Sequence, residues 1–169
     1  MKRLILPLAL LAGAAQAEVL SAADNGFAIQ HQVLVPVAPE KAYAQFLRVG
    51  QWWDGEHSWF GDASKFSIQP RAGGCFCEID GDRQVLHMTV TYVDPGRELR
   101  MVGGLGPLQM MGLSGGMAWQ FEAVEGGTRI RHSYAVSGYA EGGLSKLAVV
   151  VDRVQGHQLE RLRARLTPH

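Results

Sequence analysis

Cys75 and Cys77 are the only cysteines of the chain, and they lie in residues 75–79, whose composition predicts a strand. Side chains two positions apart on a regular strand point to one face about 6.6 Å apart, whereas a disulfide needs Cβ atoms roughly 3.5–4.5 Å apart. We therefore expect two reduced, half-buried thiols, with a bridge as the alternative if Gly73 and Gly74 bulge the strand. Metal binding or redox chemistry at Cys75 and Cys77 is a weaker alternative, because two cysteines do not complete a metal site. We expect no metal and no cofactor.

His132 and Tyr134 are the best candidates for polar chemistry inside the fold. They share one face of a strand expected over residues 128–137 with Ile130 and Val136. Imidazole and phenol groups can both transfer protons, as an enzyme would require. A histidine among apolar neighbours is, however, more often a hydrogen-bonded core residue than a base.

Three further residues of reactive type have weaker patterns. Alternation over residues 84–93 puts Leu86 and Met88 on the face opposite to His87, so His87 is expected to face solvent. His57 lies in a polar loop and is interpreted as a solvated loop residue, with the mouth of a cavity as the alternative. Ser114 completes a Gly-x-Ser-x-Gly pattern, but a nucleophile elbow needs a parallel strand before it and a helix after it, and neither is expected here.

Aromatic and methionine side chains indicate where an apolar ligand could bind. Trp59 and Phe60 lie in a loop expected over residues 54–65, and Trp119 and Phe121 share one face of a later strand. Methionine is adaptable enough to contact varied apolar ligands. The predicted lining of the cavity and its mouth is Trp53, Trp59, Phe60, Met101, Met117, Trp119, Phe121, His132 and Tyr134.

The composition limits the class of protein. The chain has 169 residues, a length that favours one domain. Its 16 basic and 16 acidic residues cancel, which gives no electrostatic case for binding nucleic acid. With 47% hydrophobic and 19% charged residues a disordered chain is excluded, and the 21 glycines favour short strands joined by turns.

The first 17 residues have the pattern of a secretory signal peptide. Lys2 and Arg3 precede an apolar run over residues 4–15, and Ala15-Gln16-Ala17 is a small-x-small cleavage signal. The run is too short to span a bilayer comfortably, and no later segment is long and apolar enough to do so. We therefore expect a periplasmic or secreted protein, with a lead-in over residues 18–26 and one domain over residues 27–167.

Hydrophobic periodicity predicts the order of the elements. A strand over residues 27–37 precedes a helix that begins at Pro39, and a meander of about six strands follows over residues 66–137. An apolar stripe with helical spacing predicts a long amphipathic helix over residues 144–166, in which Gly156 costs about 1 kcal/mol relative to alanine. This order indicates an α+β fold in which a curved antiparallel sheet of about six to seven strands wraps around the last helix.

Four segments of the sequence resemble a known superfamily. They are Val33-Leu-Val-Pro-Val-Ala-Pro-Glu-Lys-Ala-Tyr43, Trp52-Trp53, Arg71-Ala-Gly-Gly-Cys-Phe-Cys77 and Tyr92-Val-Asp-Pro-Gly-Arg97. Together with the final helix they are similar to the SRPBCC superfamily (START, polyketide cyclase and Bet v 1-like proteins), and most similar to its branch related to the activator of Hsp90 ATPase. The resemblance implies the helix-grip fold, with a ligand cavity between helix and sheet.

Two functions are compatible with such a cavity. The first is binding of a hydrophobic small molecule or lipid by an exported monomer. The second is an enzyme of the polyketide cyclase or hydrolase type that uses His132 and Tyr134 for proton transfer. A protein that docks a partner is a third possibility and would require an exposed apolar patch. Because one fold carries many functions, the geometry of the site must decide.

Overall fold

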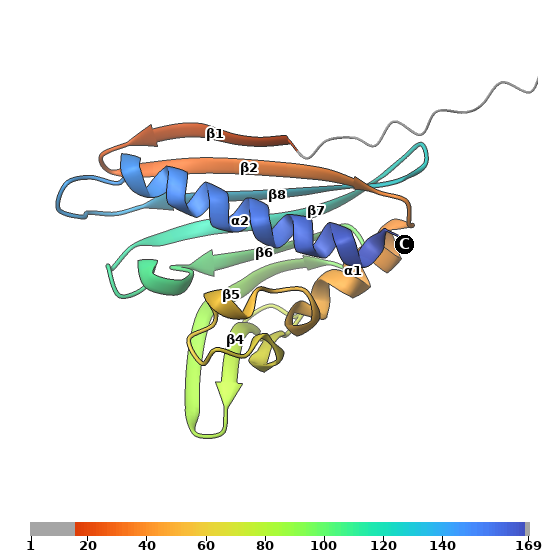
Figure 1. Ribbon diagram of the computed structural model, residues 1–169, viewed down its shortest axis with the longest axis horizontal. Coiled ribbons are helices and arrows are strands. Elements are labelled where there is room, and N and C mark those ends of the chain that lie inside the picture. Colours follow the sequence, from red (N-terminus) through yellow and green to blue (C-terminus); the bar gives the residue numbers. More distant parts are fainter. Residues whose placement is uncertain (1–15, 168–169) are drawn as a thin grey trace, which may run out of the picture.

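The computed structural model describes residues 16–167 and contains one antiparallel sheet of eight strands, in the order β1-β2-β8-β7-β6-β5-β4-β3 (Figure 1). The strands are β1 (Gln16–Ala23), β2 (Gly26–Val35), β3 (Phe66–Ile68), β4 (Cys75–Asp80), β5 (Arg83–Asp94), β6 (Glu98–Gly103), β7 (Ser114–Val124) and β8 (Gly127–Ser137). The helices are α1 (Pro39–Leu47) and α2 (Ser145–Leu166), with 3₁₀ turns at Val49–Gln51, Gly55–His57, Ala63–Lys65 and Gly106–Leu108.

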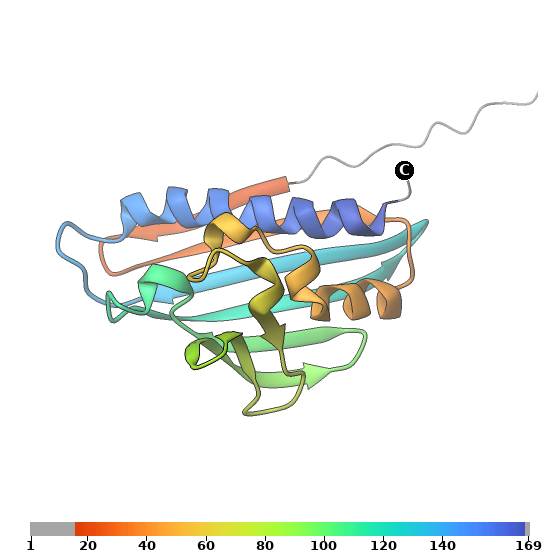
Figure 2. The same cartoon turned by 60° about the horizontal axis from the view of Figure 1, so that its bottom comes forward.

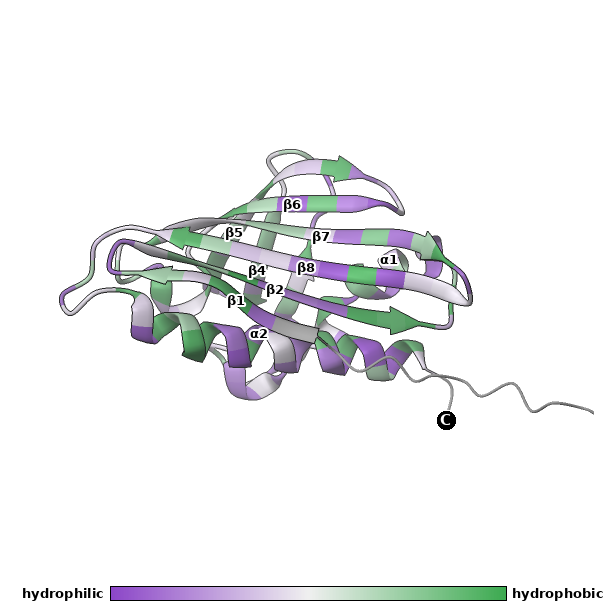
Figure 3. Ribbon diagram, turned by 90° about the horizontal axis from the view of Figure 1, so that it is seen from above, coloured by the Kyte–Doolittle hydropathy of each residue, from purple (hydrophilic) through white to green (hydrophobic). Residues whose placement is uncertain are grey.

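Helix α2 runs along one face of the curved sheet, as Figures 1 and 3 show from two directions. Helix α1 and the 3₁₀ turns that follow it lie beside α2 in front of the same face (Figure 2). The predicted α+β helix-grip fold is thus confirmed, with an open sheet. Within residues 16–167, no helix combines the length and the apolar character that crossing a membrane would need.

Strand β1 makes the sheet one strand larger than the upper expectation of seven. It pairs with β2, Glu18 opposite Gln30 and Ala23 opposite Gly26, in residues that had been assigned to the signal peptide and the lead-in. Its described side chains are almost all exposed. An edge strand of this kind shows no apolar alternation, so its sequence gave no strand signal. Most of the predicted signal peptide, residues 1–15, lies outside the described residues.

The central strands have the alternation expected for a sheet with one covered face. In β8 the buried side chains are Thr128, Ile130, His132, Tyr134 and Val136, and in β7 they are Met117, Trp119 and Phe121. This face assignment is therefore confirmed for both strands. Figure 3 shows the corresponding alternation of apolar and polar residues along the ribbons.

Strand β5 departs from simple alternation at a bulge. Phe76 pairs with Met88, but the next residue of β4, Cys77, pairs with Leu86, so His87 is an extra residue on β5. A bulge turns the following side chains to the other face. His87 is consequently buried next to Met88, whereas Leu86 is exposed. The expectation that His87 faces solvent is wrong for this reason.

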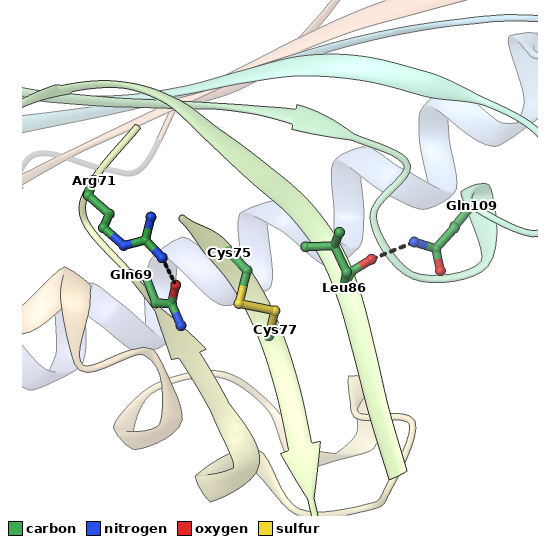
Figure 4. Close-up of a disulfide and its surroundings, with 6 residues drawn as sticks. All are labelled: Gln69, Arg71, Cys75, Cys77, Leu86 and Gln109. Atoms are coloured by element: carbon green, nitrogen blue, oxygen red, sulfur yellow. Dashed lines mark hydrogen bonds between the residues drawn. A yellow bond between two sulfur atoms is a disulfide. The ribbon is translucent and has the colours of Figure 1, made fainter. Parts of the chain in front are cut away.

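The expectation of two reduced thiols is also wrong, because Cys75 and Cys77 form a disulfide within β4 (Figure 4). Their Cα atoms are 5.5 Å apart, which is inside the usual range for bridged cysteines. Residues two positions apart on a regular strand would lie about 6.6 Å apart, so the 5.5 Å separation shows that β4 is contracted at this point, beside the bulge on β5. The disulfide also removes both sulfurs from the list of candidate metal ligands.

Helix α2 has the predicted extent but contacts the sheet unevenly. In its second half Leu159, Leu162 and Leu166 are buried, whereas in its first half Leu147 and Val151 are only partly buried. Gly156 lies against the buried ring of His31 on β2: a Cβ atom added at Gly156 would lie 3.0 Å from the ring. A glycine therefore allows close approach between α2 and β2 at this point.

Candidate ligand-binding pocket

A pocket of about 590 Å³ lies between the first half of α2 and the sheet. Three segments close it: the loop of residues 53–59, the loop of residues 105–111, and the turns of α2 from Leu147 to Gln155. Its lining comprises Trp53, Glu56, His57, Ser58, Trp59, Phe66, His87, Leu105, Gly106, Pro107, Leu108, Met111, Tyr134, Leu147, Val150, Val151, Val154 and Gln155. A concave, mostly apolar site with a few polar groups is typical of small-molecule binding.

Polar side chains of α2 hold the 53–59 loop in place. Gln158 accepts a hydrogen bond from the backbone N–H of Asp54 (2.9 Å), and its amide group lies 3.0 Å from His57 Nδ1. His157 Nε2 lies 2.7 Å from Asp54 Oδ2, and Arg161 donates to the backbone oxygen of Trp52 (2.8 Å). The pKa of Asp54 is lowered, first by the hydrogen bond from the Glu56 N–H and then by His157. The loop is therefore an anchored wall of the pocket.

Glu78 on β4 anchors the same loop from the side of the sheet. It is fully buried, and its carboxylate accepts hydrogen bonds from Ser58 Oγ (2.7 Å) and from the backbone N–H of Trp59 (3.1 Å). The Nε2 atom of His87 lies 2.8 Å from the other carboxylate oxygen. A buried carboxylate is tolerated only with such partners. Glu78 lies two residues after the buried Phe76 and shares its face, but sequence reasoning missed it because a carboxylate in a strand is usually exposed.

His87 is the buried histidine that lines the pocket. Its ring stacks on Phe66 with centroids 5.3 Å apart and lies 5.5 Å from the ring of Phe76. Burial lowers the pKa of His87, against the opposing effect of Glu78. The imidazole is therefore neutral near pH 7, and its second nitrogen, Nδ1, is buried without a hydrogen-bond partner.

Tyr134 also lines the pocket, but its hydroxyl group is already engaged. It donates to the backbone oxygen of Gly103 (3.0 Å) and accepts from the backbone N–H of Leu105 (3.1 Å). Burial raises the pKa of Tyr134 to about 12. These bonds tie the start of the 105–111 loop to β8, which assigns Tyr134 a structural role in the pocket wall.

His132 lies away from the pocket lining, in the core beside Trp119. It is fully buried, its ring is 4.3 Å from that of Trp119, and neither ring nitrogen has a hydrogen-bond partner. Burial, together with the nearby His31, lowers the pKa of His132 to about 3. The proton-transfer pair suggested by the sequence is therefore not assembled: only Tyr134 borders the pocket.

The remaining predicted residues divide into two groups. Trp53 and Trp59 line the pocket, and Trp59 is 45% exposed at its mouth. Phe60 lies outside the lining and carries Arg83 over its ring at 4.7 Å. Four other residues predicted to line the cavity are buried in the core and lie outside the pocket lining: Met101, Met117, Trp119 and Phe121.

Two further observations concern other sites. Within residues 16–167, no group of three or more His, Cys, Asp or Glu side chains is arranged to hold a metal ion. A second hollow of about 770 Å³ lies beside the β5–β6 turn and is lined mainly by polar and charged residues, among them Glu40, Asp94, Arg97, Glu98, Glu122, Arg129 and Arg131. Its charged lining makes it a poor match for an apolar ligand.

Comparison with known proteins shows which family the sequence matches. The model of the family described as "polyketide cyclase / dehydrase and lipid transport" matches residues 27–167. This match confirms the resemblance to the SRPBCC superfamily. A comparison with curated proteins gave no match.

Solved structures with the same fold have low sequence identity to this chain. Protein MLL2253 from Mesorhizobium loti has a TM-score of 0.59 at 14% identity, covering 81% of this chain and 94% of that chain. A protein from Rhizobium leguminosarum described as putative and uncharacterized has a TM-score of 0.58 at 17% identity, covering 91% and 98%. The Aha1 dimer from Colwellia psychrerythraea has a TM-score of 0.55 at 15% identity, covering 82% and 95%. At these identities the comparisons establish the fold alone.

Proposed function

Because this chain belongs to the polyketide cyclase/dehydrase and lipid transport family, we propose that it binds a hydrophobic small molecule or lipid in the pocket under α2. The observation that carries the proposal is the pocket itself, about 590 Å³ of mostly apolar space between helix and sheet. Pockets that bury small ligands have volumes of roughly 300–1,000 Å³.

The uneven packing of α2 supports this proposal. Leu147, Val151 and Val154 belong to the apolar stripe of the helix, yet they line the pocket and stay only partly buried. Side chains of this type gain about 25 cal/mol for each Å² of apolar surface removed from water. A bound apolar ligand would cover this surface, as Leu159 and Leu162 are covered by protein in the second half of the helix.

Native mass spectrometry after gentle purification tests the proposal. We expect the full chain to carry a co-purified apolar molecule, and the variant Val151→Trp, which fills the pocket, to lose it. The matched control is Val149→Trp, because Val149 is 55% exposed and does not line the pocket. A wild-type protein that is always empty and is stabilised by no apolar ligand would contradict the proposal.

We also propose that the protein is exported to the periplasm or secreted. The support is the leader pattern of residues 1–17 and the Cys75–Cys77 disulfide, a bond that persists in oxidising compartments. N-terminal sequencing of the exported protein is expected to begin at Glu18, and Ala17→Arg is expected to block processing while Ala22→Arg does not. Retention of the unprocessed wild-type chain in the cytoplasm would contradict export.

A monomer that acts without nucleic acid is the third part of the proposal. The balanced charge of the chain supports the absence of nucleic acid, because binding to a polyanion requires an excess of basic residues. Light scattering is expected to give the mass of one chain. A stable dimer, or binding to DNA at physiological salt, would be the contrary result.

A further inference from the structure

The disulfide lies on a strand that supports one wall of the pocket. Side chains alternate along β4: Cys75 and Cys77, drawn with their bridge in Figure 4, share one face, and Phe76 and Glu78 share the other. Phe76 and Glu78 are buried in the core, whereas Cys77 is 8% exposed and Cys75 is partly exposed. The bridge therefore lies directly behind two core residues, on the opposite face of the sheet.

Those two core residues position the pocket wall. The ring of Phe76 lies 5.5 Å from those of Trp53 and His87, which both line the pocket. Glu78 accepts hydrogen bonds from the hydroxyl group of Ser58 and from the backbone N–H that follows it, and so anchors the loop that carries Trp53. A displacement of this part of β4 would therefore move both the aromatic side and the loop side of the wall.

The bridge sets the length of this part of β4. The Cα atoms of Cys75 and Cys77 are 5.5 Å apart, about 1 Å less than two residues span on a regular strand. Opposite them, β5 carries His87 as an extra residue between the partners of Phe76 and Cys77. Opening the disulfide removes the covalent constraint on the contracted segment, so β4 can extend and its pairing with β5 can change.

The bridge is also of a kind that opens readily. A disulfide between residues two positions apart closes a very short loop, so the stability that it gives by constraining the unfolded chain is small. Exposed disulfides are the labile ones, and Cys75 is partly exposed. Such a bond contributes little to global stability and remains available for exchange with thiols.

We infer that the Cys75–Cys77 disulfide controls the affinity of the pocket: the oxidised protein binds the apolar ligand tightly, and reduction by a dithiol weakens binding. This inference rests on the proposed function, because its readout is binding in the same pocket. The physical link is the segment of residues 75–78, which carries the bridge on one face and supports the wall with the other. Loss of one net hydrogen bond to Glu78 would weaken binding about fivefold.

The exchange is balanced with a dithiol as the reductant. Its thiolate attacks Sγ of Cys75, the more exposed of the two cysteines, the S–S bond breaks, and Cys77 leaves as a thiolate that takes up a proton. The second thiol of the reductant then attacks the mixed disulfide and releases Cys75 as a thiol. The protein gains two electrons and two protons, and the reductant becomes a disulfide.

Fluorescence titration with N-phenyl-1-naphthylamine, a neutral apolar probe, tests the inference on the wild-type protein before and after reduction with dithiothreitol. Thiol titration verifies that both cysteines are reduced. We expect the reduced protein to bind the probe at least about fivefold more weakly, and reoxidation to restore the affinity.

Two results would overturn the inference and leave the proposed function intact. One is equal affinity of the oxidised and reduced proteins for the probe, and the other is a bridge that dithiothreitol does not open in the folded protein. If the oxidised protein binds neither the probe nor a co-purified molecule, the proposed function fails, and the inference with it.

One variant and two backbone resonances locate the effect. Cys75→Ser/Cys77→Ser is expected to bind the probe as weakly as the reduced wild type and to be insensitive to dithiothreitol, with the circular dichroism of a folded protein. The amide resonance of Trp59, which donates to the β4 carboxylate, should move on reduction, whereas that of Leu105, which donates to Tyr134 in another wall, should not. A folded variant that binds as tightly as the oxidised wild type, or a Trp59 resonance that stays in place, would show that the bridge does not act on the pocket.

Discussion

Two buried histidines, His132 on β8 and His87 on β5, differ in what surrounds them. His132 packs against Trp119 and lies near His31 in the tightly packed part of the core, here called the closed region, and neither of its ring nitrogens has a partner. His87 lies where α2 and the sheet separate, and Glu78 fixes the orientation of its ring beside the pocket. Burial alone therefore distinguishes little between them, since both are at most 3% exposed.

The difference teaches what makes a buried polar group a candidate for function. His132 can only remain neutral, because a charge on its ring would have no compensating partner. At the pocket, Glu78 orients the ring of His87 at the edge of a space that a ligand can fill. A perturbed pKa becomes informative about function only when it is combined with such geometry.

The largest expected effect comes from removing the carboxylate that organises the pocket. Glu78→Ala leaves Ser58, the Trp59 N–H and His87 without an acceptor in a buried site. We expect the free energy of unfolding in urea to fall by about 3 kcal/mol or more. The control is Glu122→Gln, because Glu122 is exposed in its ion pair with Arg129 and should change stability by less than about 0.5 kcal/mol. Equal effects for the two variants would contradict the anchoring role of Glu78.

The second prediction concerns pH and the closed region. Below about pH 6.5 His132 takes up a proton in the unfolded chain, whereas burial lowers its pKa to about 3 in the folded protein. The unfolded state then binds more protons, so the free energy of unfolding decreases as pH falls from 6.5 towards 3. The share of one such histidine is about 1.4 kcal/mol per pH unit, or about 2 kcal/mol between pH 7 and pH 5.

The variant His132→Leu isolates that contribution. Burial lowers the pKa values of His31 and His87 as well, so part of the pH dependence remains in the variant. We expect urea titrations at pH 7 and pH 5 to differ by about 2 kcal/mol less in His132→Leu than in the wild type. Identical pH dependence in the two proteins would mean that His132 is charged, or hydrated, in the folded state.

Periodicity predicted the closed region of the molecule well and the pocket region less well. The start of α1 at Pro39, the extent of α2 and the buried faces of β7 and β8 follow from regular spacing, which a sequence displays directly. His87 was assigned to the wrong face because one extra residue on β5 inverts the alternation. A bulge depends on the pairing of two strands, so one strand's sequence does not display it.

The other residues that were missed or misplaced also depend on contacts between segments that are distant in the sequence. Glu78 was not a candidate, because a carboxylate in a strand is usually exposed and its buried partners come from a distant loop. Of the nine residues predicted to line the cavity, Trp53, Trp59 and Tyr134 border the pocket. The space opens beneath the first half of α2, and only the three-dimensional packing of the helix determines where it opens.

A third prediction concerns the disulfide beside the bulge. The double variant Cys75→Ser/Cys77→Ser is expected to lose only about 1–2 kcal/mol of stability, since the bridge closes a very short loop. Thiol labelling of the denatured wild-type protein should detect no free cysteine before reduction and two after it. Hydrogen exchange should accelerate in β4 and β5 and stay unchanged in β2 and β8; faster exchange throughout would contradict a local role.

The smallest expected effect, and the one whose sign is most informative, is that of Gly156→Ala in the closed region. Helix propensity alone would make alanine more stable by about 1 kcal/mol. The added Cβ, however, would lie 3.0 Å from a carbon of the His31 ring, which is 3% exposed and has little room to move. We expect this crowding to cancel or outweigh the propensity, so that the variant is no more stable than the wild type.

A double-mutant cycle separates the two effects. In a His31→Ala background the ring is absent, and Gly156→Ala should then stabilise the protein by about 1 kcal/mol. Urea unfolding of the four proteins gives the interaction energy directly. If Gly156→Ala stabilises both backgrounds equally, α2 has room to move away from β2 at this point. The second half of α2 would then pack less tightly against the sheet than the contact of Gly156 with His31 indicates, and would differ less from the first half over the pocket.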